Sequence, residues 1–574
     1  MYLEIKGGLV KENYNFIGWS TKSNGTGIGY LEGETLEITE NITLYAKWVK
    51  IDQSDINWNE IYELEEVTDG YKIVKYKDKV EKEVVIPDEI NGKKIVSIGD
   101  SAFSWNNLRS VEIPDSVTKI GDGAFSRNNL TSVVIGNSVT TIGDSAFSSN
   151  NLRSVVIPDS VTKIGKSAFY GNNLTSVEIG NSVTKIGNQA FYNNIFLTSV
   201  KIGNSVTIVG KSAFSWNNLT SVEIPDSVTK IGDGAFSWNN LTSVVIGNSV
   251  TKIGSEAFYN NKLTSIEIPD SVTIVGKSAF SSNNLTSVVI PDSVIEIGSL
   301  AFYSNNLTSV EIGNSVTIVG KSAFSWNNLR SVVIGNSVTK IGSEAFSVNQ
   351  LTSIDIPDSV IEIGDQAFSN NELTSVVIGN SVTKIGSLAF YSNNLTSVVI
   401  GNSVTTIGAS AFSWNNLTSV EIPDSVTIVG NSAFFGNELT SVVIGNSVTT
   451  IGDQAFSGNE LTSVVIPDSV IGIGDYAFYS NNLTSVVIGN SVTEIGNHAF
   501  SKNKLTSVVI PGSVTKIRYR TFSDNKLTSI VIPDSVTEIE SYAFSSNPLE
   551  EIRGKEGSYA EQYAEENNIK FVIE

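Results

Sequence analysis

Apolar residues recur with a period of 22 residues from Leu108 to Leu549. A typical unit reads LTSVVIGNSVTKIGDSAFSSNN; we number its positions 1 to 22 and name each unit, or coil, by its first residue. Positions 1, 4 and 6 are apolar with polar residues between them, which predicts a short strand that sends alternate side chains into a core. Positions 10, 13, 17 and 18 are spaced like a helical turn or a bent return segment.

A single coil cannot cover its own apolar residues, so stability must come from stacked neighbours. We expect a mainly β solenoid with short helical or 3-10 turns, in which the strands of about twenty coils form one long parallel sheet. At about 4.8 Å per strand the body is on the order of 100 Å long. One coil is longer by a residue, with Ile195 and Phe196 in place of a single residue.

The corners of the coil carry turn residues. Position 7 is Pro or Gly and is mostly followed by Asp or Asn, as at Pro114 and Gly136, so the strand ends there. Position 14 is nearly always Gly, as at Gly121 and Gly143, which indicates either a positive φ or a close backbone approach.

Position 21 is Asn in every coil, whereas position 22 varies among Asn, Lys, Gln, Glu and Pro. We interpret this as a buried asparagine ladder that hydrogen-bonds the backbone of a bend and of an adjacent coil. A functional role for these asparagines is the weaker alternative. The ladder includes Asn106, Asn128, Asn150, Asn283 and Asn547.

The recurring IGxxAF segment and the Ile-Pro corner resemble the BspA-type leucine-rich repeats, over residues 84 to 553. The resemblance implies a right-handed leucine-rich-repeat solenoid that is secreted or attached to a bacterial surface and binds host proteins or other cells. Here Asn stands in place of the inward Cys of that family, and most coils are one residue shorter.

Four segments follow from the pattern. Residues 1–49, with FIGWS and the closing LYAKW, resemble the internalin B-repeats, which are small β-rich modules used as stalks on bacterial surfaces; much of the opening strand of that family is missing. Residues 50–107 form a linker and an N-terminal cap with the first coil, including a hairpin that turns at Asp69-Gly70. The solenoid spans 108–548, and 549–574 form a C-terminal α/β cap whose helix begins at Ser558, with Glu561 in capping-box spacing.

The net charge of -21 argues against nucleic acid and anionic membranes as partners. There is no cysteine and no apolar stretch long enough for a transmembrane segment. The start also lacks the pattern of a signal peptide, so we expect that the export information either lies outside this sequence or was removed.

Few residues are candidates for catalysis or metal binding. The single histidine, His498, falls at position 16, which we predict to face solvent. Asp and Asn at position 8 offer a calcium ladder as a minor alternative, but they mix irregularly. No nucleophile, base and orienting group converge, so we expect neither catalysis nor a cofactor nor a metal.

The exposed strand residue at position 5 is the main variable site. It is acidic in seven coils, basic at Lys201 and valine in the remaining twelve, and after Glu421 it is an unbroken valine line. This row is a candidate binding face, although valine also simply suits a strand. Tryptophans at position 20, including the adjacent Trp216 and Trp238, are candidate interface anchors or sugar platforms, or else pack over the next coil. The candidate residues at position 5 are Glu112, Glu178, Glu223, Glu267, Glu311, Asp355, Glu421, Val443, Val465, Val487, Val509 and Val531.

The sequence therefore favours an extracellular or cell-surface protein that binds a protein or cell-surface ligand through its parallel strands. The alternative is a structural spacer or surface-layer element without a specific ligand, which the near-identity of the coils favours.

Overall fold

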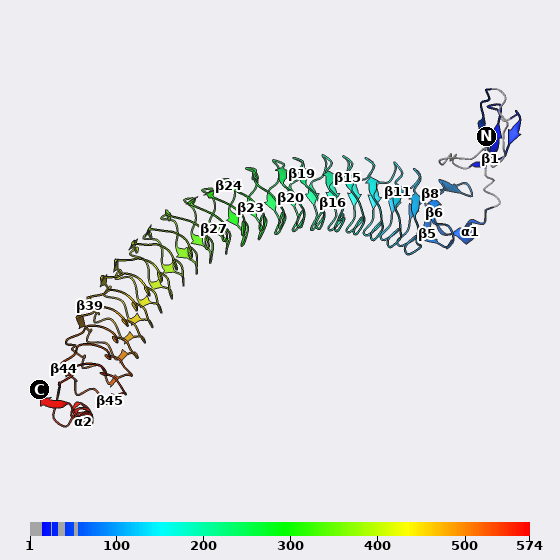
Figure 1. Cartoon of the computed structure of the whole chain (residues 1–574). Coiled ribbons are helices and arrows are strands. Elements are labelled where there is room, and N and C mark those ends of the chain that lie inside the picture. The colour runs from blue at the N-terminus through cyan, green and yellow to red at the C-terminus, as the bar shows by residue number, and fades with distance from the viewer. Residues whose placement is uncertain (1–13, 25, 32–40, 51–55) are drawn as a thin grey trace.

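The computed structural model describes residues 14–24, 26–31, 41–50 and 56–574. In Figure 1 the coils stack into one long curved body that ends in a short helix. The predicted mainly β solenoid with a long parallel sheet is confirmed.

The described part of residues 1–49 forms a small antiparallel sheet with the strand order β2-β1-β3. The ring of Phe16 lies edge-on to Trp19 and Trp48, with centroids 5.2 and 5.5 Å apart. These residues carry the resemblance to a surface repeat, whereas residues 1–13 of the predicted module lie outside the described residues. The strands are β1 (Tyr14–Ser20), β2 (Gly29–Tyr30) and β3 (Tyr45–Lys50).

A hairpin caps the first coil, as the pattern around Asp69-Gly70 predicted. The second strand of this hairpin pairs in parallel with the first strand of the long sheet. Tyr76, from the end of the hairpin, stacks on Phe103 of the first coil at 5.0 Å and covers its apolar end. The elements of the cap are α1 (Trp58–Ile61), β4 (Tyr62–Val67), β5 (Gly70–Tyr76), β6 (Glu83–Val85), β7 (Glu89–Ile90) and β8 (Lys93–Ile98).

The long parallel sheet consists of two-residue strands at positions 12 and 13, which pair from each coil to the next without a break from β8 to β42. The sequence pattern placed this sheet at positions 1 to 6, so the prediction located it in the wrong segment. The strands after β8 are β10 (Lys119–Ile120), β12 (Thr141–Ile142), β14 (Lys163–Ile164), β16 (Lys185–Ile186), β18 (Ile208–Val209), β20 (Lys230–Ile231), β22 (Lys252–Ile253), β23 (Ile274–Val275), β25 (Glu296–Ile297), β27 (Ile318–Val319), β29 (Lys340–Ile341), β30 (Glu362–Ile363), β32 (Lys384–Ile385), β34 (Thr406–Ile407), β36 (Ile428–Val429), β38 (Thr450–Ile451), β40 (Gly472–Ile473), β42 (Glu494–Ile495), and then β43 (Lys516–Ile517) and β45 (Glu538–Ile539).

Glycine at position 14 permits this continuity. A Cβ on Gly165 would lie 2.5 Å from the carbonyl carbon of Gly143 in the preceding coil, so no side chain fits there. Of the two predicted reasons for this glycine, the close approach is right and the positive φ is wrong. Left-handed φ occurs instead at positions 16 and 20, for example at His498 (56°) and Trp216 (59°).

The strands at positions 3 to 6 form short separate sheets of two or three strands. They are β9 (Ser110–Glu112), β11 (Ser132–Val134), β13 (Ser154–Val156), β15 (Ser176–Glu178), β17 (Ser199–Lys201), β19 (Ser221–Ile224), β21 (Ser243–Ile246), β24 (Ser287–Ile290), β26 (Ser309–Ile312), β28 (Ser331–Val333), β31 (Ser375–Val377), β33 (Ser397–Val399), β35 (Ser419–Glu421), β37 (Ser441–Val443), β39 (Ser463–Val465), β41 (Ser485–Val487) and β44 (Ser529–Val531).

The breaks between these sheets follow the residue at position 7. Where it is Gly, except at Gly379, which follows a coil without a strand in this row, the corner approaches the coil before it: a Cβ on Gly247 would lie 2.5 Å from the carbonyl oxygen of Pro225. Where it is Pro, the ring occupies that space, and with two exceptions, Pro114 and Pro533, no strand pairs with the coil before. The breaks precede the coils that contain Pro158, Pro225, Pro269, Pro291, Pro357, Pro423, Pro467 and Pro511.

We expect Gly247→Ala to open the β19–β21 pair, because the added methyl group cannot fit beside the Pro225 carbonyl. The amide of Ile224, which the repeat places against the Val245 carbonyl as Ile422 is placed against Val443, should lose about 1–2 kcal/mol of protection in hydrogen exchange. Gly379→Ala is the matched control, since its Cβ meets only the Asp358 side chain, at 3.2 Å, and its strand is already unpaired with the coil before. Equal effects of the two substitutions would contradict the role of position 7.

The interior is a set of columns that run the length of the body. Position 18 contributes phenylalanine rings stacked from Phe103 to Phe544, with neighbouring centroids between 4.9 and 5.9 Å apart. Leucine at position 1 and alanine at position 17, such as Leu285 and Ala301, are fully buried beside them. The columns join neighbouring coils into one apolar core.

The asparagine at position 21 is buried and bonds two coils. Nδ2 of Asn283 donates to the carbonyl oxygens of Phe258 and Phe280, at 2.9 and 3.1 Å, and Oδ1 accepts from the amide of Leu263 at 3.1 Å. Phe280 and Leu263 belong to the same coil as Asn283, and Phe258 belongs to the coil before. In the first coil Asn106 instead accepts a hydrogen bond from Nζ of Lys79. The full set recurs at Asn128, Asn150 and Asn547.

The long sheet breaks between β42 and β43. Position 14 of the following coil is Arg518 in place of the usual glycine that would lie against Gly496. One coil later Glu540 also replaces the glycine, yet β45 pairs with β43 and the amide of Glu540 donates to Ile517 at 2.9 Å, so the loss of glycine breaks the sheet only where the coil before still carries glycine. Among the described residues, the amide of Arg518 makes no hydrogen bond to the coil before it, whereas the amide of Gly496 donates to Ile473 at 2.8 Å. Nη2 of Arg518 lies 3.6 Å from Oε2 of Glu494 across this seam.

The C-terminal cap packs a helix over the last coil. Ala560 and Ala564 are buried, and Tyr563 lies edge-on to Phe544 at 6.1 Å. The predicted capping box is wrong: the Ser558 side chain makes no cap bond, and Oε2 of Glu561 accepts from the amide of Gly557 at 2.7 Å. The elements are β46 (Glu551–Gly554), α2 (Tyr559–Glu566) and β47 (Lys570–Ile573), with both strands parallel to β44.

Candidate functional site

The side chains at position 5, which we call the position-5 row, project from the strands at positions 3 to 6. The valines of the second half are more than half exposed: 61% for Val443, 63% for Val465, 59% for Val487 and 75% for Val509. Val531 is only partly exposed, because β46 pairs beside it, so it does not extend the open valine line. The acidic residues of the first half are exposed as well: Glu112, Glu178, Glu223, Glu267, Glu311, Asp355 and Glu421.

One pair in the acidic half is neutralised within the chain. Nζ of Lys201 lies 2.5 Å from Oε1 of Glu178 in the preceding coil, and this hydrogen bond raises the pKa of Lys201. Both side chains are well exposed, so the pair contributes little to stability.

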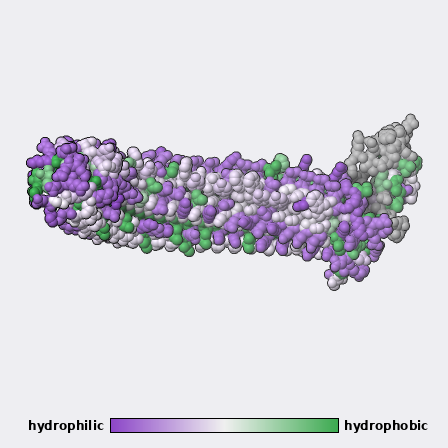
Figure 2. Space-filling view, turned by 90° about the horizontal axis from the view of Figure 1, so that it is seen from below, coloured by the Kyte–Doolittle hydropathy of each residue, from purple (hydrophilic) through white to green (hydrophobic). Residues whose placement is uncertain are grey.

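Two clefts open on the acidic half where position 7 is Pro. One, of about 490 Å³, is lined by Glu223, Pro225 and Val245, and the other, of about 400 Å³, by Glu267 and Val289. Both clefts combine a carboxylate with an exposed apolar side chain. Figure 2 shows that apolar residues on the side seen there form small separate spots.

Trp216 and Trp238 lie on a different segment, the turn at positions 16 to 20, and do not join the position-5 row. Their rings stack on each other, with centroids 4.8 Å apart and planes 16° apart, and Trp238 meets the edge of Tyr259 at 5.7 Å. Each tryptophan turns one ring face to the other, so neither ring has both faces open to a ligand.

The prediction that His498 faces solvent holds only in part, because the ring is half-buried. Its ring stacks on Tyr476 at 4.5 Å and meets the edge of Tyr519 at 5.4 Å, and its Nδ1 is buried and, within the described residues, without a hydrogen-bond partner. Burial lowers the pKa of His498, and Arg520 adds to the lowering. The sequence signal for this packing is Tyr476, the aromatic residue at the same position one coil earlier.

We expect His498 to make stability fall with acidification. The pKa of His498 is lower in the folded protein than in the unfolded chain, so the unfolded chain binds more protons on acidification. Stability is therefore lost as the pH falls below about 6.5, the ordinary pKa of histidine. His498→Tyr, which places the residue of Tyr476 and Tyr542 at this position, should remove that component. The measurement is the urea midpoint of the wild type and of the His498→Tyr variant at pH 7.5 and 5.0. An identical pH dependence of the two midpoints would refute the role of His498.

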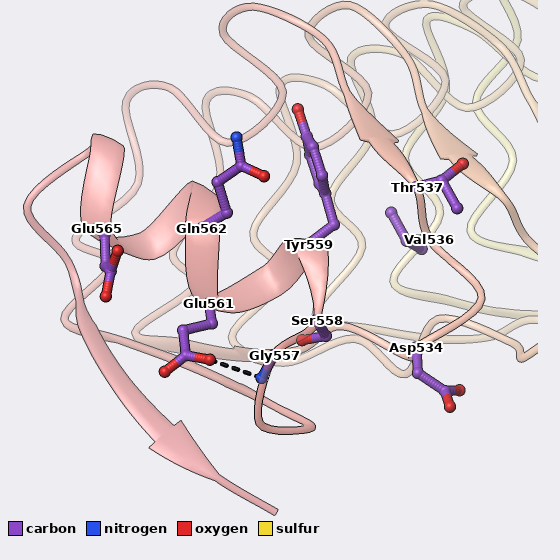
Figure 3. A pocket seen from close by; sticks show the side chains of 9 residues that line it. All are labelled: Asp534, Val536, Thr537, Gly557, Ser558, Tyr559, Glu561, Gln562 and Glu565. Atoms are coloured by element: carbon purple, nitrogen blue, oxygen red, sulfur yellow. Dashed lines mark hydrogen bonds between the residues drawn. The ribbon is translucent and has the colours of Figure 1, made fainter.

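A third cleft, of about 520 Å³, lies beside α2. Figure 3 shows that Glu561 turns to the amide of Gly557, while Asp534 lies across the opening. Nothing here forms a nucleophile with a base. Within the residues that the structure describes, no group of three His, Cys, Asp or Glu side chains suits a metal ion, and no helix could cross a membrane.

Stacked coils with two rows of parallel strands and continuous phenylalanine and asparagine columns define a leucine-rich-repeat solenoid. Residues 96–219, 207–330, 317–439 and 427–551 match the BspA type leucine rich repeat region, so the chain belongs to this family. Residues 4–47 match the Listeria-Bacteroides repeat domain. Both family resemblances predicted from the sequence are thus confirmed.

Solved structures of bacterial leucine-rich repeat proteins are similar to the chain. One from Bacteroides ovatus is 19% identical, with 89% of this chain and 97% of that chain covered and a TM-score of 0.37. One from T. pallidum is 29% identical over 27% of this chain and 75% of that chain, with a TM-score of 0.26. No curated protein matches the chain.

Proposed function

We propose that this protein binds another protein on a cell or matrix surface through its position-5 row, and that it has no catalytic role. The observation that carries the proposal is the row itself. Its side chains are exposed on strands whose backbones are fixed by the coils beneath, so the row is pre-organised and loses little entropy on binding.

The composition of the row supports a protein partner. Exposed valines in line offer apolar area, and the clefts beside Glu223 and Glu267 offer carboxylates for polar contacts. A nucleic-acid partner is disfavoured by the net charge of -21.

The proposed location is the bacterial surface or the extracellular space. The BspA-type repeats and the N-terminal repeat module both match, and the sequence resemblances associate each with bacterial surface proteins. Detection of the protein on intact cells by antibody, with and without surface proteolysis, tests this location.

The binding test screens the full chain against extracellular-matrix proteins, mucins and whole bacterial cells. For a saturable ligand, Val443→Glu, Val487→Glu and Val509→Glu combined should weaken binding at least ~10-fold, because charges replace apolar contacts. Thr406→Glu, Ile428→Glu and Thr450→Glu add the same charge at position 12, where Glu296 is natural, and should bind normally. Normal binding by the valine variant would show that the row is not the binding surface.

The second candidate is a structural spacer without a ligand. The unbroken pairing from β8 to β42 favours it, since such a ladder resists extension. Silence across the binding screen, together with a rigid elongated particle in small-angle scattering, would favour the spacer.

A further inference from the structure

One edge of coils 174 to 219 exposes four large apolar side chains away from the position-5 row. Ile195 and Phe196 are 51% and 52% exposed, and Trp216 and Trp238 are 45% and 40% exposed. Contiguous apolar area of this kind marks interaction surfaces on soluble proteins.

The same edge breaks the local rules of the repeat. Ile195 and Phe196 arise from the one-residue insertion, whereas position 22 elsewhere is mostly polar. Beside them Asn194 is fully buried, yet its Oδ1, alone in the ladder among the described residues, has no hydrogen-bond partner. An unsatisfied acceptor and exposed apolar groups both cost stability, and such violations concentrate at functional sites.

The residues at positions 19 and 20 of four consecutive coils read as a palindrome. Going along the chain, the pairs are Tyr-Asn, Ser-Trp, Ser-Trp and Tyr-Asn, so the centre lies between coils 197 and 219. Side chains at the same position of neighbouring coils form regular rows, as the 4.8 Å between the ring centroids of Trp216 and Trp238 indicates. The pairs are Tyr192-Asn193, Ser215-Trp216, Ser237-Trp238 and Tyr259-Asn260.

The charged residues at position 15 are arranged about the same centre. At position 15, Lys211 lies in the coil before the centre and Asp233 in the coil after it. A two-fold axis that passes through this centre, perpendicular to the stack, reverses the order of the coils in the second copy. Each position of the repeat in one copy then faces the same position of the repeat in the other. It therefore sets Trp216 of one copy over Trp238 of the other, and Lys211 over Asp233.

We propose that this edge binds a second copy of the chain, antiparallel to the first, in a two-fold symmetric dimer. A symmetric interface requires a self-complementary patch, which the tryptophan pair, the palindrome and the opposite charges provide; Ile195 and Phe196 fall opposite Lys262 of the other copy and border this patch. Four coils span about 20 Å, so the interface falls below the roughly 800 Å² per partner of a standard complex. With a net charge of -21 on each copy, the dimer is weak and reversible.

Sedimentation velocity of the full chain from about 1 to 200 µM tests the dimer. We expect a monomer–dimer equilibrium that Trp216→Ser with Trp238→Ser weakens at least ~10-fold. Serine is natural at this position with the same left-handed φ, as at Ser282 (56°), so the fold is kept. Trp326→Ser with Trp414→Ser makes the same change outside the palindrome and should leave the dimer intact. A monomer at every concentration, or equal effects of both pairs, overturns the proposal.

Cross-linking tests the symmetry, and the chain has no cysteine to interfere. Mixed Asn188→Cys and Ser255→Cys proteins, with the substitutions at position 15 of the outer coils 174 and 241, should join through a short bismaleimide. Each alone should not, because the same position of the two copies is then three coils, or about 14 Å, apart along the stack. Lys211→Asp should weaken the dimer and adding Asp233→Lys should restore it. Equal self-linking of either single variant overturns the two-fold arrangement.

Discussion

Replacement of Asn283 by leucine is expected to lower the free energy of unfolding by about 3–5 kcal/mol. The substitution removes the partners of two carbonyl groups and one amide, those of Phe258, Phe280 and Leu263. Each buried backbone group left without a partner costs roughly 1–3 kcal/mol, and the added burial of leucine offsets part of that sum. Urea unfolding and hydrogen exchange of the Leu263 amide measure the effect.

The matched control is Asn284→Lys, one residue further on. Asn284 is exposed, and Lys262 occupies the same position in a neighbouring coil, so the change should stay within about 0.5 kcal/mol. If Asn283→Leu is as stable as the wild type, the asparagine ladder does not hold the coils together.

Replacement of Gly298 by valine should split the long sheet at one coil. A Cβ there would lie 2.6 Å from the amide nitrogen of Lys277 and 2.7 Å from the carbonyl carbon of Gly276, both of them backbone atoms that cannot move aside. Because the residue before it in the stack is Gly276, as Gly496 is for Arg518, we expect the two backbones to shift apart, and the hydrogen bonds from Gly298 to Val275 and from Ile295 to Thr273, each 2.9 Å, should lengthen. We expect a loss of about 2–4 kcal/mol.

Hydrogen exchange resolved by residue checks this result, because the amides of Ile295 and Gly298 should exchange faster while distant coils stay protected. Gly472→Thr is the control: no atom lies within 4 Å of its added Cβ, and position 12 carries Thr in other coils. That substitution should be neutral or stabilise by up to about 1 kcal/mol. A tolerated valine at Gly298 would mean that the close approach does not hold the sheet.

The position-5 row followed from the sequence, because alternation in a strand separates its two faces, and its exposure held for the valines up to Val509. The partial burial of Val531 did not follow from the sequence, because it depends on β46, a strand from a later segment, pairing with β44. For the same reason, the surroundings of His498 were missed: its neighbours Tyr476 and Tyr519 come from adjacent coils.

The sequence by itself determined the period of the coil, its buried positions and the need for glycine at position 14, because each is a local pattern repeated many times. Only the tertiary structure decided which segment forms the continuous sheet. A two-residue strand carries no alternation that a pattern could reveal, and its pairing depends on how closely Gly at position 14, and Gly or Pro at position 7, let neighbouring coils approach.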